Sequence, residues 1–247
     1  MRINVKWYGW VPDVPDQRDY LYRAIRPVVR LPKEVDLCKL CSDVENQGAL
    51  GSCTANALAG NLEFLDNMND AAYKDVSRLF IYYNERLLEG TVSSDSGASL
   101  RDGIKTLRKY GSCWEDRWPY IIKYFDRRPP QTCYAQARQH RIESYHRIST
   151  LSEMLACLCE GYPFVFGFSV YESFESKRVA ATGVVNMPKK SEIVLGGHAV
   201  MAVGFNRKNK RFLVRNSWGT DWGMAGYFTM PYEYLETLAA DFWTIRR

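Results

Sequence analysis

The sequence predicts an α+β protein with two lobes, one mainly helical and one mainly β, and a cleft between them. In the first half of the chain, apolar residues recur three and four positions apart, as on the buried face of a helix. The second half instead holds short β-branched and aromatic runs separated by turn residues. Helices and strands that are segregated along a chain favour α+β over alternating βαβ units.

Composition limits the class of protein. The 247 residues are 46% hydrophobic, which is enough for a sizeable core. No apolar run approaches the roughly 20 residues that span a bilayer, and the first residues lack the apolar region of a signal peptide. The net charge of +5 is scattered rather than gathered in one patch. We therefore expect a soluble monomer with neither a nucleic acid nor a membrane as its partner.

The N-terminal 36 residues are expected to form an extension rather than a core element. They have no clear periodicity and are interrupted by prolines. The folded domain is then expected over 37–247, with a helical lobe at about 45–143. Its helices are predicted at three places along the chain: about 53–67, 76–89 and 99–109.

A β lobe is expected at about 144–236, followed by a C-terminal tail. It begins with a capping box, Thr150 to Glu153, that predicts a helix as far as about Cys159. The strands that follow are predicted to form an antiparallel, barrel-like sheet. They are expected at 163–170, 198–206, 211–218 and 226–231.

Seven cysteines bear on chemistry and on location. Their odd number fits one nucleophile and up to three disulfide bridges, which favours an oxidising compartment and a secreted or extracytoplasmic location. Cys38 and Cys41 have the spacing of a zinc knuckle, but no second cysteine or histidine pair completes four ligands. We therefore expect no metal and no other cofactor. The cysteines are at positions 38, 41, 53, 113, 133, 157 and 159.

Cys53 is the candidate nucleophile. It follows Gly51 and Ser52 at the predicted start of a helix, where free N–H groups and the helix dipole favour a thiolate. The alternative is a buried structural cysteine, which usually has larger apolar neighbours than these. Gln47, six residues upstream, is the candidate donor of a hydrogen bond to an oxyanion, together with the Cys53 N–H.

His198 is the candidate acid and base, because it follows two glycines at the start of an apolar strand. Asn216 is the candidate that orients the imidazole from the neighbouring strand, and Trp218 could cover the bond between them. The alternatives are a structural histidine and an ordinary turn at Asn216. His140 and His146 lie in a polar, arginine-rich stretch and are predicted at the surface.

These motifs together resemble those of the papain-like cysteine peptidases. The segments QGALGSC, GGHAV and RNSWGTDWG occur in the family's order. The resemblance implies a two-lobed fold with a helical lobe, an antiparallel β-barrel-like lobe and the active site between them. It implies Cys53 as nucleophile, His198 as acid and base, and Asn216 as the residue that orients the imidazole. It also gives Gln47 as the oxyanion donor and Trp218 as the shield.

The resemblance further implies substrate contacts at Gly97 and Gly197, and peptide substrates and cysteine-protease inhibitors as partners. Leu50 stands where most family members have a bridged cysteine, and this variant motif is typical of a bacterial subgroup. The implied activity is that of a thiol endopeptidase that works through a thioester. An acyltransferase or transglutaminase-like enzyme is one alternative, and a papain-fold module that binds peptides without cleaving them is another.

The N-terminal extension leaves two hypotheses open. It is too short for the long helical prodomain of animal and plant members. It could be a short pro-segment that lies over the cleft, which would make the chain a zymogen. It could equally pack on the far face and cover apolar surface there.

Overall fold

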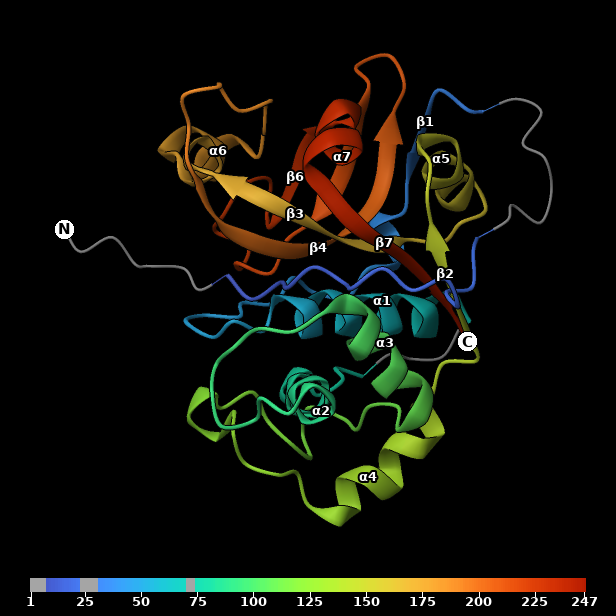
Figure 1. Ribbon diagram of the computed structural model, residues 1–247. Coiled ribbons are helices and arrows are strands. Elements are labelled where there is room, and N and C mark those ends of the chain that lie inside the picture. Colours follow the sequence, from blue (N-terminus) through green and yellow to red (C-terminus); the bar gives the residue numbers. More distant parts are fainter. Residues whose placement is uncertain (1–7, 23–30, 70–73) are drawn as a thin grey trace.

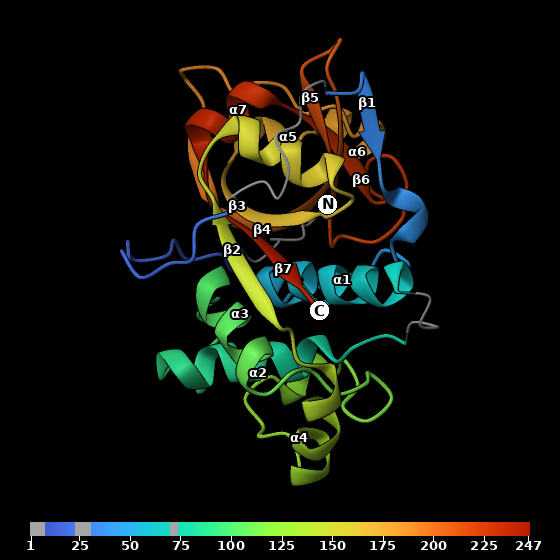
Figure 2. The ribbon, with the colours of Figure 1, turned by 90° about the vertical axis from the view of Figure 1, so that its right-hand side faces the viewer.

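The computed structural model describes residues 8–22, 31–69 and 74–247. Figures 1 and 2 show two layers, an antiparallel sheet with helices flanking it and a second group of helices packed below it. The predicted α+β class is confirmed, because helices dominate the first half of the chain and strands the second. None of the helices in the described ranges is long and apolar enough to cross a membrane.

In the described ranges four helices build the helical lobe, and two of them begin at a capping serine. The side chains of Ser77 and Ser99 accept hydrogen bonds from the third helical residue of α2 and α3, respectively, and Gly90 ends α2 in the left-handed region. Almost every residue of α1 is buried, since other elements pack on it from several sides. These helices are α1 (Cys53–Met68), α2 (Arg78–Glu89), α3 (Leu100–Lys109) and α4 (Gln131–Ala137).

The strands form one antiparallel sheet in the order β2-β7-β3-β4-β5-β6, with β1 paired to β4. Over the described residues β2 and β6 end the sheet without pairing to each other, so the expected barrel-like lobe is an open sheet. The strands are β1 (Glu34–Asp36), β2 (Ser144–Ile148), β3 (Phe164–Tyr171), β4 (Val194–Asn206), β5 (Arg211–Arg215), β6 (Tyr227–Pro231) and β7 (Ala239–Arg246).

Three helices flank the sheet, namely α5 (Leu151–Cys159), α6 (Lys177–Thr182) and α7 (Tyr232–Leu238). The capping box predicted at Thr150 and Glu153 is present at the start of α5. Short 3-10 turns complete the chain at Cys38–Leu40, Ile122–Tyr124, Arg138–His140 and Glu172–Glu175.

The C-terminal segment is a central part of the sheet. Strand β7 lies between β2 and β3, and its Trp243 is completely buried. The sequence prediction had only a tail here. Strand β7 pairs with residues more than 70 positions earlier in the chain, and no local pattern reveals such a partner.

One hydrophobic cluster joins the two layers. It contains Leu58 of α1 together with Ala199 and Met201 of β4 and Trp243 of β7. The helix that starts at Cys53 is thus packed directly on the strand that carries His198. The two predicted site residues are held by the same core.

Residues 8–22, which we call the arm, run between the helical lobe and the sheet (Figure 1, blue). Trp10 and Tyr22 are buried, and Tyr22 is bonded to the Arg147 backbone of β2. The N-terminal extension therefore contributes to the core, contrary to the prediction. Its last residues also form β1, which pairs with β4.

All seven cysteines lie in the described ranges, and all are free thiols. None of the three bridges that the sequence allowed is formed. Leu50, which stands in place of a family cysteine, is buried in the hydrophobic cluster that joins the two layers.

Candidate active site

Cys53 is the first residue of α1, and its thiol is completely buried. Backbone N–H groups of Thr54, Ala199 and Gly9 point at the sulfur. Thr54 belongs to the helix N-terminus, Ala199 follows His198 on β4, and Gly9 belongs to the arm. The sulfur therefore sits where both lobes and the arm meet.

Burial raises the pKa of the Cys53 thiol to about 12, although the three N–H groups act to lower it. The sequence predicted a lowered pKa from the helix N-terminus. The prediction is wrong for this state of the protein, in which the thiol has no exposure to water and the arm lies over it.

His198 and Asn216 are brought together by the antiparallel pairing of β4 with β5. The imidazole Nε2 lies 2.8 Å from the Asn216 Oδ1, and both residues are buried. The Trp218 ring stacks on the imidazole at a centroid distance of 4.9 Å and an interplanar angle of 28°. The arrangement fixes the plane of the ring and keeps water from the bond to Asn216.

Gln47 is held from both sides of its amide. The Ser217 hydroxyl donates to Gln47 Oε1 over 2.6 Å, and Gln47 Nε2 donates to the Leu50 carbonyl over 3.0 Å. The Gln47 backbone N–H also donates to the Ser217 carbonyl. This orientation turns the amide NH₂ toward the loop that ends at Cys53.

The arm lies along Gly97 and Gly197, the two predicted substrate-contact residues. The Ala98 N–H donates to the Gly9 carbonyl, the Val11 N–H to the Ala98 carbonyl, and the Trp10 N–H to the Gly197 carbonyl. A Cβ at Gly97 would lie 2.1 Å from the Gly9 carbonyl oxygen, and one at Gly197 would lie 2.6 Å from the Trp10 oxygen. Both glycines therefore permit a polypeptide backbone to lie against them.

Sequence reasoning missed residues that support the site. The Tyr82 hydroxyl contacts Asp95 and accepts a hydrogen bond from the Gly97 N–H. Asp95 in turn accepts from the Gly51 N–H at 3.0 Å. Ser217 was visible within the asparagine motif, but its contact with Gln47 is tertiary and leaves no signal in the spacing.

The histidine predictions need one correction. His140 is buried rather than exposed, because its ring packs against Trp114 at a centroid distance of 3.8 Å. Burial lowers the pKa of His140 to about 4. His146 is half-buried on β2. Neither contacts Cys53 or Asn216 in the contacts described for them, and the site contains only the third histidine, His198.

Comparison with known proteins decides the family. Residues 31–237 match the family described as papain family cysteine protease. The chain belongs to the papain family. It is thus a cysteine-type peptidase, as the resemblance predicted.

Relatives of this papain-family chain include viral and bacterial proteins. It is 43% identical over 269 residues to an uncharacterized peptidase C1-like protein of Acanthamoeba polyphaga mimivirus, with 97% of this chain and 86% of that protein covered. The crystal structure of xylellain, a cysteine protease from Xylella fastidiosa, matches with a TM-score of 0.92 at 41% identity. The match covers 100% of this chain and 98% of the xylellain chain. The predicted similarity to the bacterial subgroup is confirmed.

The fold is shared more widely. Bromelain from Ananas comosus, solved in complex with the E64 inhibitor, matches with a TM-score of 0.67 at 20% identity, covering 87% of this chain and 99% of that one. At this identity the likeness concerns the fold alone.

Proposed function

We propose that this papain-family peptidase is an endopeptidase in which Cys53, His198 and Asn216 carry the catalysis. The observation that supports the proposal most strongly is the 2.8 Å contact between His198 Nε2 and Asn216 Oδ1 beneath Trp218. A group that bonds to one imidazole nitrogen orients the other nitrogen toward the nucleophile. It also fixes the tautomer needed for proton transfer. The neighbouring residue, Ala199, directs its N–H at the Cys53 sulfur.

In the proposed mechanism, His198 takes the proton of the Cys53 thiol, and the resulting thiolate attacks the carbonyl carbon of a peptide bond. The oxyanion that forms accepts hydrogen bonds from Gln47 Nε2 and the Cys53 N–H. His198 then protonates the leaving amine, which leaves a thioester on the sulfur. Water then attacks the thioester with His198 as base. This step releases the acid product and regenerates the free thiol.

The path of the arm favours cleavage within a chain over removal of end residues. Tyr8 lies on one side of the site, with its ring centroid 6.3 Å from that of His198, and Val11 lies on the other side, bonded to Ala98. A polypeptide therefore extends past Cys53 in both directions. An exopeptidase instead has one end of its site closed.

We also propose that the arm limits access to Cys53, which makes the full chain a zymogen. Gly9 lies directly against Gly51, where its own Cβ would be 1.6 Å from the Gly51 carbonyl oxygen. Its N–H points at the Cys53 sulfur. A substrate carbonyl cannot reach the sulfur while Gly9 occupies this position. The described contacts of residues 8–11 support this course of the arm over one on the far face.

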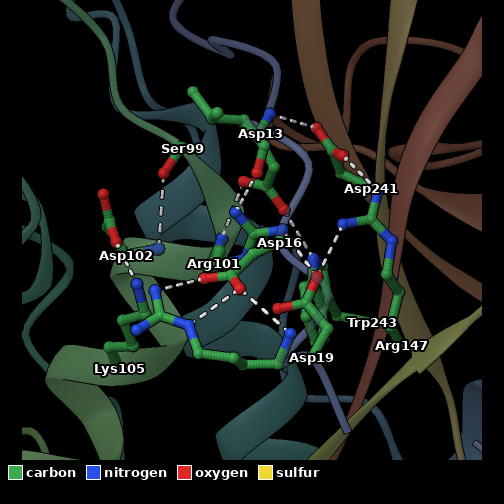
Figure 3. A network of polar contacts seen from close by, with 12 residues as sticks. Asp13, Asp16, Asp19, Ser99, Arg101, Asp102, Lys105, Arg147, Asp241 and Trp243 are labelled. Carbon is green, nitrogen blue, oxygen red and sulfur yellow. Dashed lines mark hydrogen bonds and ion pairs between the residues drawn. The ribbon is translucent and has the colours of Figure 1, made fainter. Parts of the chain in front are cut away.

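An ion network anchors the later residues of the arm (Figure 3). Asp19 Oδ2 lies 2.6 Å from an Arg101 nitrogen and 3.0 Å from an Arg147 nitrogen. Arg147 also pairs with Asp241, which accepts a hydrogen bond from the Asp13 N–H over 2.7 Å. Asp13 accepts in turn from the Arg101 N–H. Residues 13–19 thus hold the preceding segment close to Cys53.

Labelling with an epoxysuccinyl peptide inhibitor tests the proposed site. The full chain, its Gly9→Ala variant and Cys53→Ala are incubated with the inhibitor at mildly acidic pH, and adducts are located by mass spectrometry. The proposal requires one adduct on Cys53, formed faster in Gly9→Ala and absent in Cys53→Ala. An adduct elsewhere, or none in either Cys53-containing form, would contradict it.

Digestion of an unfolded protein substrate tests the reaction. Internal cleavages with free carboxyl ends support an endopeptidase. Products joined to an added amine would support the acyltransferase alternative. Saturable peptide binding without any product would support the binding module. As partners we propose peptide or protein substrates and cysteine-protease inhibitors.

A further inference from the structure

Behind the loop that carries the oxyanion donors lies a chain of hydrogen bonds that no step above uses. The Tyr120 hydroxyl donates to the Gln47 carbonyl over 2.9 Å and lies 2.5 Å from the Ser52 Oγ. Since the single phenol proton goes to Gln47, the Ser52 hydroxyl donates to Tyr120. Asn56 Nδ2 donates to the same Ser52 Oγ over 3.1 Å. The bonds therefore run in one direction from α1 to Gln47.

The two ends of this loop carry the two groups that face the oxyanion. Gln47 provides its side-chain amide, and Ser52 immediately precedes the N–H of Cys53. Both Gln47 and Ser52 are buried. Tyr120 is the one side chain in the described contacts that bonds to both, so its hydroxyl links the two ends of the loop.

The ring of Tyr120 packs against a buried, ion-paired arginine that restricts its movement. The guanidinium carbon of Arg78 lies 4.1 Å from the Tyr120 ring centroid. Arg78 is buried and pairs with Glu45 at 2.9 Å and Glu115 at 3.1 Å. Glu115 also accepts the Tyr120 N–H over 2.6 Å. The ring is thus held from its face and from its backbone.

We propose that Tyr120 is a positioning residue for the oxyanion site, acting through Gln47 and the Cys53 N–H. The inference rests on the proposed function of Gln47. Donors stabilise a transition state only if they are already placed where the charge develops, and a misplacement of about 1 Å costs up to about 10²-fold in rate. Loss of the Tyr120 hydroxyl removes one hydrogen bond at each end of the loop without removing either donor.

The test compares Tyr120→Phe with Tyr134→Phe, both in the full chain that carries Gly9→Ala. Phenylalanine keeps the ring over Arg78 and loses only the hydroxyl. Tyr134 offers a matched control, since its hydroxyl donates over 3.0 Å to Asn84 in the same lobe but away from the site. We expect kcat for a fluorogenic peptide to fall about 10- to 100-fold in Tyr120→Phe with KM unchanged, and to stay within about twofold in Tyr134→Phe.

Two further measurements separate positioning from general damage. Alkylation of Cys53 by iodoacetamide forms no oxyanion, so its rate should be unchanged in Tyr120→Phe. In a Gln47→Ala background, Tyr120→Phe should lower kcat by fewer fold than it does in the Gly9→Ala parent, because only the Cys53 N–H then remains to be positioned.

Three results would overturn the inference while leaving the proposed function in place. They are an unchanged kcat in Tyr120→Phe, an equal fall in turnover and alkylation, and a full additive loss in the Gln47→Ala background. If the Gly9→Ala parent itself cleaves no peptide, the proposed function fails, and the role of Tyr120 fails with it.

Discussion

Replacement of Gly9 by alanine tests directly whether the arm blocks the site. The new Cβ would lie 1.6 Å from the Gly51 carbonyl oxygen and 2.3 Å from its carbon, and both are backbone atoms. No rotamer relieves a contact of this kind. Residues 8–11 must therefore leave their position, while the ion pairs of Asp19 keep the following segment attached.

The size of the effect follows from the bonds that are lost. Three backbone hydrogen bonds join residues 9–11 to Ala98 and Gly197. At about 1 kcal/mol each, they favour the closed state by about 3 kcal/mol, which leaves about 1% of the parent protein open. The arm and the substrate compete for the same site, so turnover at substrate concentrations well below KM should then rise about 10²-fold in Gly9→Ala.

Initial rates on a fluorogenic peptide measure this change, and iodoacetamide alkylation of Cys53 at pH 7 provides a second readout. Opening exposes a thiol whose pKa burial raises to about 12, so alkylation should also become faster. Val14→Ala is the matched control, because Val14 is on the same arm and its residue is 78% exposed. A folded Gly9→Ala protein that neither cleaves nor alkylates faster than its parent would refute the reasoning.

Further predictions concern single residues. Gln47→Ala should lower kcat by about 10²–10³ with the alkylation rate of Cys53 preserved, and a parallel loss of both would argue against an oxyanion role. Asn216→Ala should lower kcat about tenfold through loss of the buried bond to His198, as stopped-time peptide assays would measure; full activity would contradict the orienting role. Burial raises the pKa of Glu63 from 4.5 to about 7. The folded state thus favours the protonated carboxyl, and this contribution is complete below pH 4.5 and is lost as the pH rises through 7. Glu63→Gln should remove about 3 kcal/mol of this pH dependence from the free energy of unfolding in urea, and an unchanged slope would show that the carboxyl is ionised in both states.

Much of the fold could be predicted because its signals are local. Ser77 and Ser99 each begin a helix that the spacing of apolar residues predicts, and Thr150 begins one that its capping box with Glu153 predicts. Strand β7 and the path of the arm could not be predicted, since their partners are distant in the chain. Trp10 is bonded to Gly197, and nothing in the residues around Trp10 encodes that contact.

In the candidate site, too, residues within short motifs could be predicted and residues that act through long-range contacts could not. Cys53, His198, Asn216 and Gln47 could be selected because their roles require particular residue types within short motifs, although their individual roles remain proposals. The sequence assigned no role to Tyr120. Its contacts with Ser52 and Gln47 bridge 68 and 73 positions, so only the folded chain shows what its hydroxyl bonds to.

The anchors at Asp13 and Asp19 make the arm an inhibitor that is attached to its own target. A contact of about 3 kcal/mol corresponds to a dissociation constant in the millimolar range or weaker for a separate peptide. Attachment supplies the effective concentration that such a weak contact needs. A single cut between residues 11 and 13 would let the segment that carries Gly9 diffuse away, and at cellular dilution it would not return. Release by cutting would therefore be irreversible and independent of protein concentration, whereas release by displacement would reverse as soon as the competitor was gone.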